Sequence, residues 1–394
     1  MTGRSVVVWS DALLAYDPGP GHPLRSVRLE LTIALARMLG LLERPGVELR
    51  APRPAPDETL LLVHDEQYVA AVRAGRPALE HGLGDTDNPT FPGLHDAAAL
   101  VTGASVAAAQ AVWSGQAQHG VSVAGGLHHA HRDRAAGFCV YCDPAVAIAW
   151  LLQSGAKRVA YVDVDAHNGD GVSEAFAADP RVLTISLHQE GTTAFPGNGF
   201  PEEIGSGDAE GDMVNVALPP FTDDAGWLRA FSGIVPVLLR SFEPEVLVTQ
   251  GGCDAHRDDH MADLSLTVDG LAAAYAELHD LSHELCEGRW LALGGGGYDL
   301  AGVVPRAWTA MLAIATGDPL PLDTALPQQW RELVSERCGR VGPAQLGDLE
   351  DGVPPHFTLW DAGTGDVEDA VDRSVAATRN AVLPLHGLDP MRDR

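Results

Sequence analysis

The 394-residue sequence predicts an α/β fold, in which a mostly parallel sheet is covered by helices on both faces. From about residue 158 to residue 315, short apolar runs alternate with longer segments of helical periodicity, which is the pattern of successive β–α units. The apolar runs are nearly continuous, as expected for strands buried on both faces. Polar clusters follow the ends of these runs, where ligands bind in parallel sheets.

In the N-terminal part, the elements are predicted from apolar periodicity and from turn residues. A strand is expected over residues 5–10 and a Gly- and Pro-rich loop over 16–22, followed by a helix over 23–42. A short strand is predicted over 60–63 and a short helix over 65–74. After a polar loop over 81–93, the segments predicted next are a helix over 94–113, a strand over 120–126 and a helix over 144–153.

In the C-terminal part, the alternation becomes regular. Strands are predicted over 158–164, 181–187, 214–218, 245–249 and 290–293, and helices over 171–177, 224–241, 268–286 and 301–315. After Pro319 the pattern weakens, and one further helical piece is expected over 367–381. We therefore expect one catalytic domain over 1–320 and a C-terminal extension, 321–394, packed on the same domain.

The bulk composition narrows the class of protein. A formal net charge of -28 and a pI near 4.7 argue against binding nucleic acid or an anionic membrane through bulk charge. No signal peptide and no apolar run of membrane-spanning length are expected. Five cysteines with no framework spacing predict a reducing, cytoplasmic location. The pair Cys139-x-x-Cys142 leaves redox chemistry open as an alternative role.

The stretch from 161 to 170, YVDVDAHNGD, is the centre of the predicted site. If the strand continues, Asp163, Asp165 and His167 lie on one face, and Asp170 follows. Three buried polar groups are costly unless they bind something, and two carboxylates with an imidazole suit a catalytic metal ion. The alternative is a buried ion network at the strand end.

A third metal ligand is expected beside Asp165 and His167. Asp254 follows an apolar strand and two glycines, so it is the best candidate; its alternative role is a helix cap or a turn residue. Zinc and ferrous iron both suit two Asp and one His.

Two further clusters predict acid–base and oxyanion chemistry. Adjacent side chains diverge in extended backbone, so His128 and His129 are expected to act beside the metal. Asp163 and Asp170 could each orient one of them, although two satisfied loop histidines are the alternative. Tyr298 follows four glycines and could donate a hydrogen bond to a developing oxyanion. A Gly-rich phosphate loop is disfavoured here because the spacing and the lysine of such loops are missing.

Taken together, the motifs resemble the zinc-dependent histone deacetylase family. The segments that carry the likeness are GGLHHAHRDRAAGFCVYCD (125–143), YVDVDAHNGDGVSEAF (161–176), SLHQEGTTAFPGNG (186–199), QGGCDAH (250–256) and LALGGGGYDL (291–300). Within the family the chain is most similar to the bacterial acetoin utilization (AcuC-type) deacetylases. GPGHP (19–23), DNPTFPG (87–93) and PLHGLDP (384–390) extend this likeness to nearly the whole chain.

The resemblance implies a three-layer α/β fold of the arginase/deacetylase type and a bound zinc ion. The implied metal ligands are Asp165, His167 and Asp254. It also implies a structural potassium ion, with matching residues Asp163, Asp165, His167, Ser186 and Leu187. A second, weaker potassium site would fall around Phe176, Asp179 and Val182.

The resemblance also implies roles in catalysis and in substrate binding. His129 would be the general base and acid, with His128 acting electrostatically, and Tyr298 would polarise the acetyl carbonyl. By the family pattern, Asp163 supports His128 and Asp170 supports His129. The implied substrate-binding residues are Gly137, Phe138 and Phe195 in the tunnel wall, Met261 at its rim, Gly296 near its floor and Asp87 on the substrate backbone. Arg28 would lie in the inner cavity through which acetate leaves.

The sequence departs from the family pattern at a few positions. Asn168 replaces the usual second His of the HHGD run, so an effect on metal affinity or rate is expected, but no ligand is lost. Cys142 replaces a usual Asn and is given no role. His131 and Arg132 follow the His pair, where other members also carry basic residues.

The predicted function is metal-dependent removal of acetyl groups from acetyl-lysine in proteins, with acetyl-CoA synthetase among the substrates that the resemblance implies. An acetylpolyamine amidohydrolase, acting on a small acetyl-amine, is the alternative, because an acidic chain attracts a polycation. A manganese ureohydrolase would need an Asp at position 169, which is Gly. A non-catalytic acyl-lysine or metal-binding protein would lack a ligand, a His or the Tyr. The sequence predicts no oligomeric state.

Overall fold

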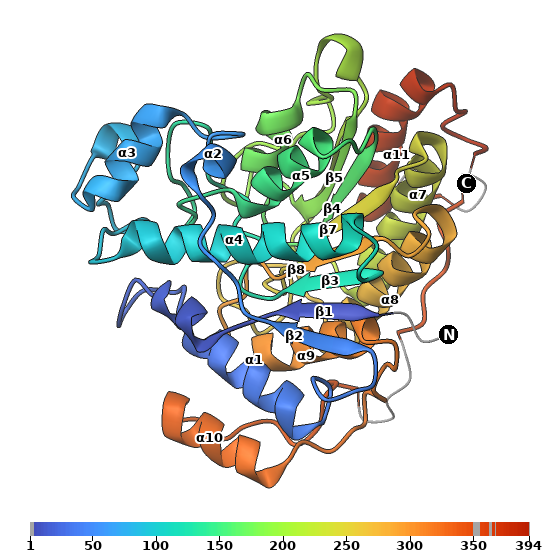
Figure 1. Cartoon of the computed structure of the whole chain (residues 1–394). Coiled ribbons are helices and arrows are strands. Elements are labelled where there is room, and N and C mark those ends of the chain that lie inside the picture. The colour runs from blue at the N-terminus through green and yellow to red at the C-terminus, as the bar shows by residue number, and fades with distance from the viewer. Residues whose placement is uncertain (1–3, 350–354, 362–364, 367, 394) are drawn as a thin grey trace.

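An eight-stranded parallel sheet forms the centre of the computed structural model, which describes residues 4–349, 355–361, 365–366 and 368–393 (Figure 1). The strand order is β2-β1-β3-β8-β7-β4-β5-β6, and every pairing is parallel. The strands are β1 Ser5–Val8, β2 Val47–Arg50, β3 His119–Ser122, β4 Val159–Asp163, β5 Val182–Gln189, β6 Met213–Leu218, β7 Val246–Gln250 and β8 Trp290–Leu293. The predicted α/β fold with a mostly parallel sheet is confirmed.

Two groups of helices cover the two faces of this sheet. One group packs on β1, β3, β8, β7, β4 and β5 and comprises α4 Leu94–Trp113, α5 Asp143–Gln153 and α6 Asp170–Phe176. The other group comprises α1 Val27–Met38, α7 Asp224–Phe242, α8 Val268–Leu285, α9 Val304–Ala315 and α11 Ala370–Val382. Shorter or peripheral elements are α2 Asp57–Leu60, α3 Glu66–Ala74, α10 Gln328–Cys338, η1 Asp11–Ala15, η2 Leu79–His81, η3 Gly207–Ala209 and η4 Leu383–His386.

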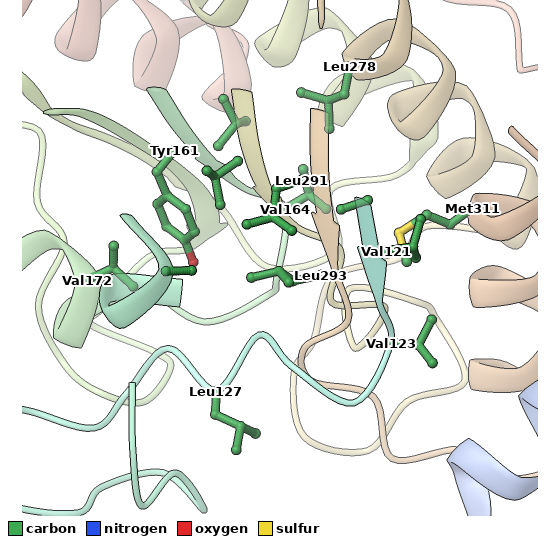
Figure 2. Packing of buried hydrophobic residues seen from close by; sticks show 14 of the residues in the cluster. Val121, Val123, Leu127, Tyr161, Val164, Val172, Leu278, Leu291, Leu293 and Met311 are labelled. Carbon is green, nitrogen blue, oxygen red and sulfur yellow. The ribbon is translucent and has the colours of Figure 1, made fainter. Parts of the chain in front are cut away.

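The core lies between the sheet and these helices. In Figure 2, Val121 of β3 and Leu291 of β8 lie near Leu278 of α8 and Met311 of α9, and all four side chains are fully buried. Strands covered on both faces have no solvated side, which explains their continuous apolar runs.

Side-chain caps fix the start of several helices. Asp223 accepts a hydrogen bond from the Gly226 N–H at the start of α7, and Thr267 accepts one from the Gly270 N–H at the start of α8. Each cap satisfies one of the backbone donors that a helix start leaves without a partner. Both helices follow strand-end loops, so the caps also fix where those loops finish.

Three local predictions differ from the structure. The strand predicted over 60–63 is wrong, because α2 ends at Leu60 and a turn follows; a short apolar run does not distinguish strand from helix. The strand β2 was not predicted, because it is a short edge strand with no fully buried residue. The prediction of a single helical piece in the tail is also wrong, because α10 precedes α11.

Helix α10 was not predicted from the sequence because it buries little apolar surface. Of its 11 residues only Trp330 and Val334 are buried, so the helical periodicity is weak. The Trp330 indole N–H donates to the Leu31 carbonyl of α1 at 2.9 Å. Helix α11 packs on α7 and β6, and the Thr378 hydroxyl donates to the Asn215 carbonyl at 2.7 Å. Both tail helices therefore rest on the sheet-and-helix core; residue 367, where the second was expected to begin, lies outside the described residues.

Candidate metal and catalytic site

The polar clusters of the sequence converge at the carboxyl edge of the sheet. They lie in the loops that follow β3, β8, β7 and β4, which are four consecutive strands of the sheet. Strand β4 ends at Asp163, so the strand does not continue far enough to place Asp165 and His167 on one of its faces. A turn places them instead: Asp163 Oδ1 accepts the Asp165 N–H at 3.1 Å, and Asp165 Oδ1 accepts the His167 N–H at 3.0 Å.

Asp165, His167 and Asp254 form a compact group of three ligand atoms. His167 Nδ1 lies 3.1 Å from Asp165 Oδ1 and 3.0 Å from Asp254 Oδ2, and all three side chains are buried. A tetrahedral metal ion with bonds of about 2.0–2.1 Å separates its ligand atoms by about 3.3 Å. The three donors therefore fit a divalent metal ion such as zinc with little rearrangement.

The free oxygens of the two carboxylates are held by the surrounding chain. Gln250 Nε2 donates to Asp165 Oδ2 at 2.6 Å, and the Gly296 N–H donates to the same oxygen at 2.7 Å. The Ala166 N–H donates to Asp254 Oδ1 at 2.9 Å. Such partners orient metal ligands. The role of Gln250 was not predicted from the sequence, where its signal is a polar residue at the end of the buried strand β7.

Burial and mutual charge set the protonation of this group. Burial raises the pKa of the Asp254 carboxyl, and the charge of Asp165 raises it further. Burial would also raise the pKa of Asp165, but the charges of His128 and His167 hold it well below its usual range. Two carboxylates that compete for one imidazole in a buried site leave negative charge that a bound cation neutralises.

His128 and His129 lie in a turn, and their rings converge. The expectation that they diverge in extended backbone is wrong: the ring centroids are 4.0 Å apart, and the two Nε2 atoms are 3.0 Å apart. His128 Nδ1 lies 2.7 Å from Asp163 Oδ2, and His129 Nδ1 lies 2.8 Å from Asp170 Oδ1. Because an ionised carboxylate only accepts, both Nδ1 atoms carry a proton, and both Nε2 atoms face the site.

The two histidines have opposite pKa shifts. Although burial lowers the pKa of His128, the charges of Asp163 and Asp165 raise it to about 9. Burial lowers the pKa of His129 to about 4, with a further contribution from the neighbouring His128 charge. Near neutral pH, His128 is therefore charged, and His129 is neutral. This pairing of an acid with a base is the arrangement that general acid–base catalysis requires.

Asp143 holds the backbone of the His128–His129 loop. It accepts the Gly126 N–H at 3.0 Å and the Leu127 N–H at 2.8 Å, and the Ser105 hydroxyl also donates to it. Sequence analysis assigned no role to this residue. The sequence signal was an acidic residue at the start of a buried Ala-rich helix, which is a weak signal because helix starts are commonly acidic.

Tyr298 faces the same space from the Gly-rich loop after β8. Asp259 Oδ2 accepts both the Tyr298 N–H at 2.6 Å and the Asp299 N–H at 3.1 Å, which anchors the backbone. Burial raises the pKa of the Tyr298 phenol well above its usual value, so the phenol stays protonated and can donate a hydrogen bond. Asp259 was missed by the sequence analysis.

Two aromatic rings lie against His129 and Tyr298. The Phe195 ring lies 4.9 Å from the His129 ring, and the Phe138 ring lies 5.7 Å from the Tyr298 ring. Phe138 has φ 69°, an uncommon conformation for a residue with a side chain, and the Tyr16 hydroxyl donates to its carbonyl at 2.8 Å. A strained backbone is thus held so that the Phe138 ring faces Tyr298.

The other residues expected to bind substrate or product lie around this centre. Gly137 has φ 50°, and a Cβ there would lie 2.4 Å from His129 Cδ2. The Met261 carbonyl is 3.2 Å from His167 Nε2, and Asp87 is exposed, with its carbonyl 3.0 Å from His22 Nε2. Arg28 is buried behind the Gly-rich loop and donates to the carbonyls of Gly295 and Gly297, each at 2.9 Å.

The residues matched to potassium sites lie beside the metal group. Ser186 is the register partner of Asp163 on the adjacent strand β5, and Leu187 follows it. The weaker site falls in the turn between α6 and β5, where the Val182 N–H donates to the Asp179 carbonyl and the Asp179 N–H donates to the Phe176 carbonyl.

Asn168 and the cysteine pair lie close to the site without joining it. Asn168 Nδ2 donates to Asn198 Oδ1 at 2.9 Å, and its own Oδ1 is buried without a hydrogen-bond partner among the described residues. Cys139 and Cys142 are unpaired and buried, and burial raises the pKa of both thiols. Because both thiols therefore stay protonated, and the thiolate is the reactive form, the redox role that the sequence left open is disfavoured.

Comparison with known proteins places the chain among characterised folds and families. Residues 22–315 match the family model described as the histone deacetylase domain. The chain is 39% identical over 359 residues to the acetoin utilization protein AcuC of Bacillus subtilis, covering 89% of this chain and 92% of that protein. It is 34% identical over 379 residues to AcuC of Staphylococcus aureus, covering 91% and 97%. The crystal structure of an HDAC homolog from Aquifex aeolicus matches with a TM-score of 0.79 and 29% identity, covering 95% of this chain and 100% of that one.

Proposed function

Because this chain belongs to the histone deacetylase family of hydrolases, we propose that it removes acetyl groups from lysine side chains of proteins with the help of a bound divalent metal ion. The observation that carries the proposal is the geometry of His128 and His129, each held at Nδ1 by a carboxylate and in contact through Nε2, beside the three-ligand group. A charged and a neutral imidazole in contact provide an acid and a base at one pH.

Asp165, His167 and Asp254 would hold the metal, and zinc suits their two oxygens and one nitrogen, with ferrous iron as the other candidate. When bound, the metal lowers the pKa of a water molecule and polarises the acyl carbonyl. The residues matched to potassium, Asp163, Ser186 and Leu187 among them, would support the same loop. Gln250 and Gly296 keep the Asp165 carboxylate in place for this role.

The His pair accepts the proton of the attacking water and later donates one to the leaving group. His129 Nε2, which carries no proton and lies 3.0 Å from His128 Nε2, accepts this proton, while Asp170 holds the opposite ring nitrogen and stabilises the imidazolium that forms. His128 keeps its charge through Asp163, and the Tyr161 hydroxyl donates to the same carboxylate at 2.6 Å. The protonated pair then returns a proton to the departing amine.

Tyr298 stabilises the negative charge that develops on the carbonyl oxygen. Its phenol is neutral, and Asp259 fixes the Tyr298 backbone, so the hydroxyl can donate with little reorganisation at the moment of reaction. The Phe138 and Phe195 rings flank a narrow approach that suits the aliphatic stem of a lysine side chain. Gly137 and Met261 complete this wall, with Gly296 at its floor. The exposed Asp87 would accept backbone N–H groups of the substrate, and Arg28 would contact the leaving acetate.

The test is hydrolysis of an acetyl-lysine peptide by metal-stripped protein with zinc or ferrous iron added back. We expect turnover that depends on the metal and is lost in Asp165→Ala and strongly reduced in Tyr298→Phe. Metal-restored turnover that persists in Asp165→Ala would contradict the assigned ligands.

The five cysteines are all unpaired, which agrees with the reducing, cytoplasmic location that we propose.

Acetylpolyamine hydrolysis is the second candidate, supported by the net charge of -28 and by Asp85 and Asp87, which are exposed together. Acetylated putrescine is therefore assayed beside the peptide. Turnover of the polyamine alone would assign the chain to that activity.

A further inference from the structure

Three histidines meet on the molecule away from the catalytic group. His279 and His283 are four residues apart on α8, and His119 begins β3. Their rings form a closed triangle with centroid distances of 4.9 Å (119–279), 5.1 Å (119–283) and 4.6 Å (279–283). One nitrogen from each ring lies within 4.8 Å of the others. A pair of histidines at this helical spacing is a recurrent chelating arrangement, because both rings face the same side.

The rings are also oriented as metal ligands usually are. A ligating imidazole commonly donates its other N–H to a backbone carbonyl or a carboxylate. His119 Nδ1 lies 2.7 Å from the Ala315 carbonyl, and His279 Nδ1 lies 3.2 Å from Asp280 Oδ1. Both Nδ1 atoms therefore carry a proton, so the neutral form of each ring has its lone pair on Nε2. His119 Nε2 is 3.0 Å from His283 Nε2, close to the separation of about 3.3 Å between ligands of tetrahedral zinc.

The cluster has a rigid base and an open side. His119 is buried, and the centroid of the Trp290 ring lies 5.7 Å from that of His119 and 5.8 Å from that of His279. His279 is partly exposed and His283 is exposed, so an ion and a water molecule have access. Burial lowers the pKa of His119 to about 4 and lowers that of His283. Neutral imidazoles are the form that binds a metal.

The cluster is separate from the catalytic group. His119 pairs in register with Trp290, the first residue of β8, so the cluster lies at the amino edge of the sheet, beside α8 (Figure 1). The catalytic loops leave the carboxyl ends of the same two strands, about 10 Å further along. A hydrogen-bonded histidine contact between α8 and β3 is the alternative explanation, but it accounts for only one of the three close approaches.

We propose that His119, His279 and His283 form a second metal site, specific for a transition-metal ion that prefers imidazole ligands, with zinc as its occupant. Three imidazoles and one open position suit zinc, and they offer no carboxylate oxygen for calcium or magnesium. A bound ion would join the last turn of α8 to the start of β3.

The test is zinc stoichiometry measured on metal-stripped, tag-free full-length chain, with a chromophoric chelator as competitor at free zinc up to about 10 µM. We expect two equivalents for the unsubstituted chain and one for His279→Asn and for His283→Asn, both with unchanged deacetylase activity. His386→Asn, which replaces a histidine of η4 outside the cluster, is the matched control and keeps two equivalents. Cobalt(II) provides a spectroscopic check: tetrahedral absorption bands in Asp254→Asn should disappear when His283→Asn is added.

The outcomes separate this proposal from the catalytic one. If the two cluster variants keep the stoichiometry of the unsubstituted chain, or if His386→Asn lowers it equally, the second site is refuted. If Asp254→Asn leaves the stoichiometry unchanged while His283→Asn lowers it, the cluster stands and the catalytic ligand assignment fails. His283 is exposed, so its substitution is not expected to prevent folding, and thermal unfolding of each variant checks this.

Discussion

Replacing Gly296 with alanine tests the geometry of the catalytic metal group. A Cβ at this position would lie 2.1 Å from Asp254 Oδ2 and 2.7 Å from Asp165 Oδ2. The shorter distance is more than 1 Å inside an ordinary contact of about 3.5 Å. A ligand oxygen must therefore move by about 1 Å, whereas metal–ligand bonds hold their lengths to about 0.2 Å. A misplacement of this size costs about 100-fold in rate, which corresponds to about 2.7 kcal/mol of transition-state stabilisation.

The assay combines kcat/KM on an acetyl-lysine peptide with zinc affinity, measured on Gly296→Ala and on a matched control. Gly226→Ala is the control. Gly226 lies in the first turn of α7, and the atom nearest to an added Cβ would be Thr222 Cγ2 at 3.2 Å. We expect the control to retain activity and Gly296→Ala to lose both zinc affinity and turnover while still folding. Wild-type zinc affinity and kcat/KM in Gly296→Ala would refute the inference that this glycine sets the position of the ligand oxygens.

Three further predictions follow from the same contacts. Tyr298→Phe should lower kcat about 10²–10³-fold with little change in KM, because it removes one oxyanion donor; steady-state kinetics on the peptide would show an unchanged kcat if the role is wrong. Asp170→Asn should lower kcat about 10²-fold at unchanged zinc stoichiometry, because an amide cannot stabilise the His129 imidazolium; loss of zinc instead would indicate a ligand role. Asp348→Asn should reduce the free energy of unfolding by about 3 kcal/mol near neutral pH, because it leaves buried Arg306 without its ion pair. Burial raises the pKa of the Asp348 carboxyl, but the hydrogen bond from His256 and the charge of Arg306 lower it well below its usual range. The stabilisation is therefore present above the unfolded pKa of about 3.9 and is lost as the pH falls through the lower folded value; denaturant unfolding across acid pH should show a smaller pH dependence in the variant.

The sequence was sufficient for seven of the eight strands of the sheet and for which residues meet, because parallel strands bring their carboxyl ends to one edge. Asp165, His167 and Asp254 could be grouped from this rule alone. It was not sufficient for orientation. The rings of His128 and His129 converge because the two residues lie in a turn. The prediction assumed extended backbone, in which neighbouring side chains point apart.

Residues that act on backbone groups were the ones that the sequence did not reveal. Gln250, Asp259 and Asp143 each hold a loop through main-chain N–H groups, and such contacts depend on tertiary structure with no fixed sequence spacing. The edge strand β2 and helix α10 were not predicted, for a related reason. They bury little apolar surface, so periodicity, the main signal in a sequence, is weak there.

The C-terminal segment contributes to the site through the loop that carries Asp254. Asp348 Oδ2 accepts from His256 Nε2 and from the Val268 N–H, each at 2.8 Å, and Asp348 Oδ1 accepts from Arg306 at 2.8 Å. His256 lies two residues after the ligand and is fully buried, so the carboxylate fixes the loop between β7 and α8 from behind. The same loop carries the acid that anchors the Tyr298 backbone. A chain ending near residue 320 would lack this carboxylate, and the His256 and Arg306 side chains would lose their ion-pair partner behind this loop. We infer that the tail belongs to the unit that builds the site, and that it acts by holding a ligand loop in place.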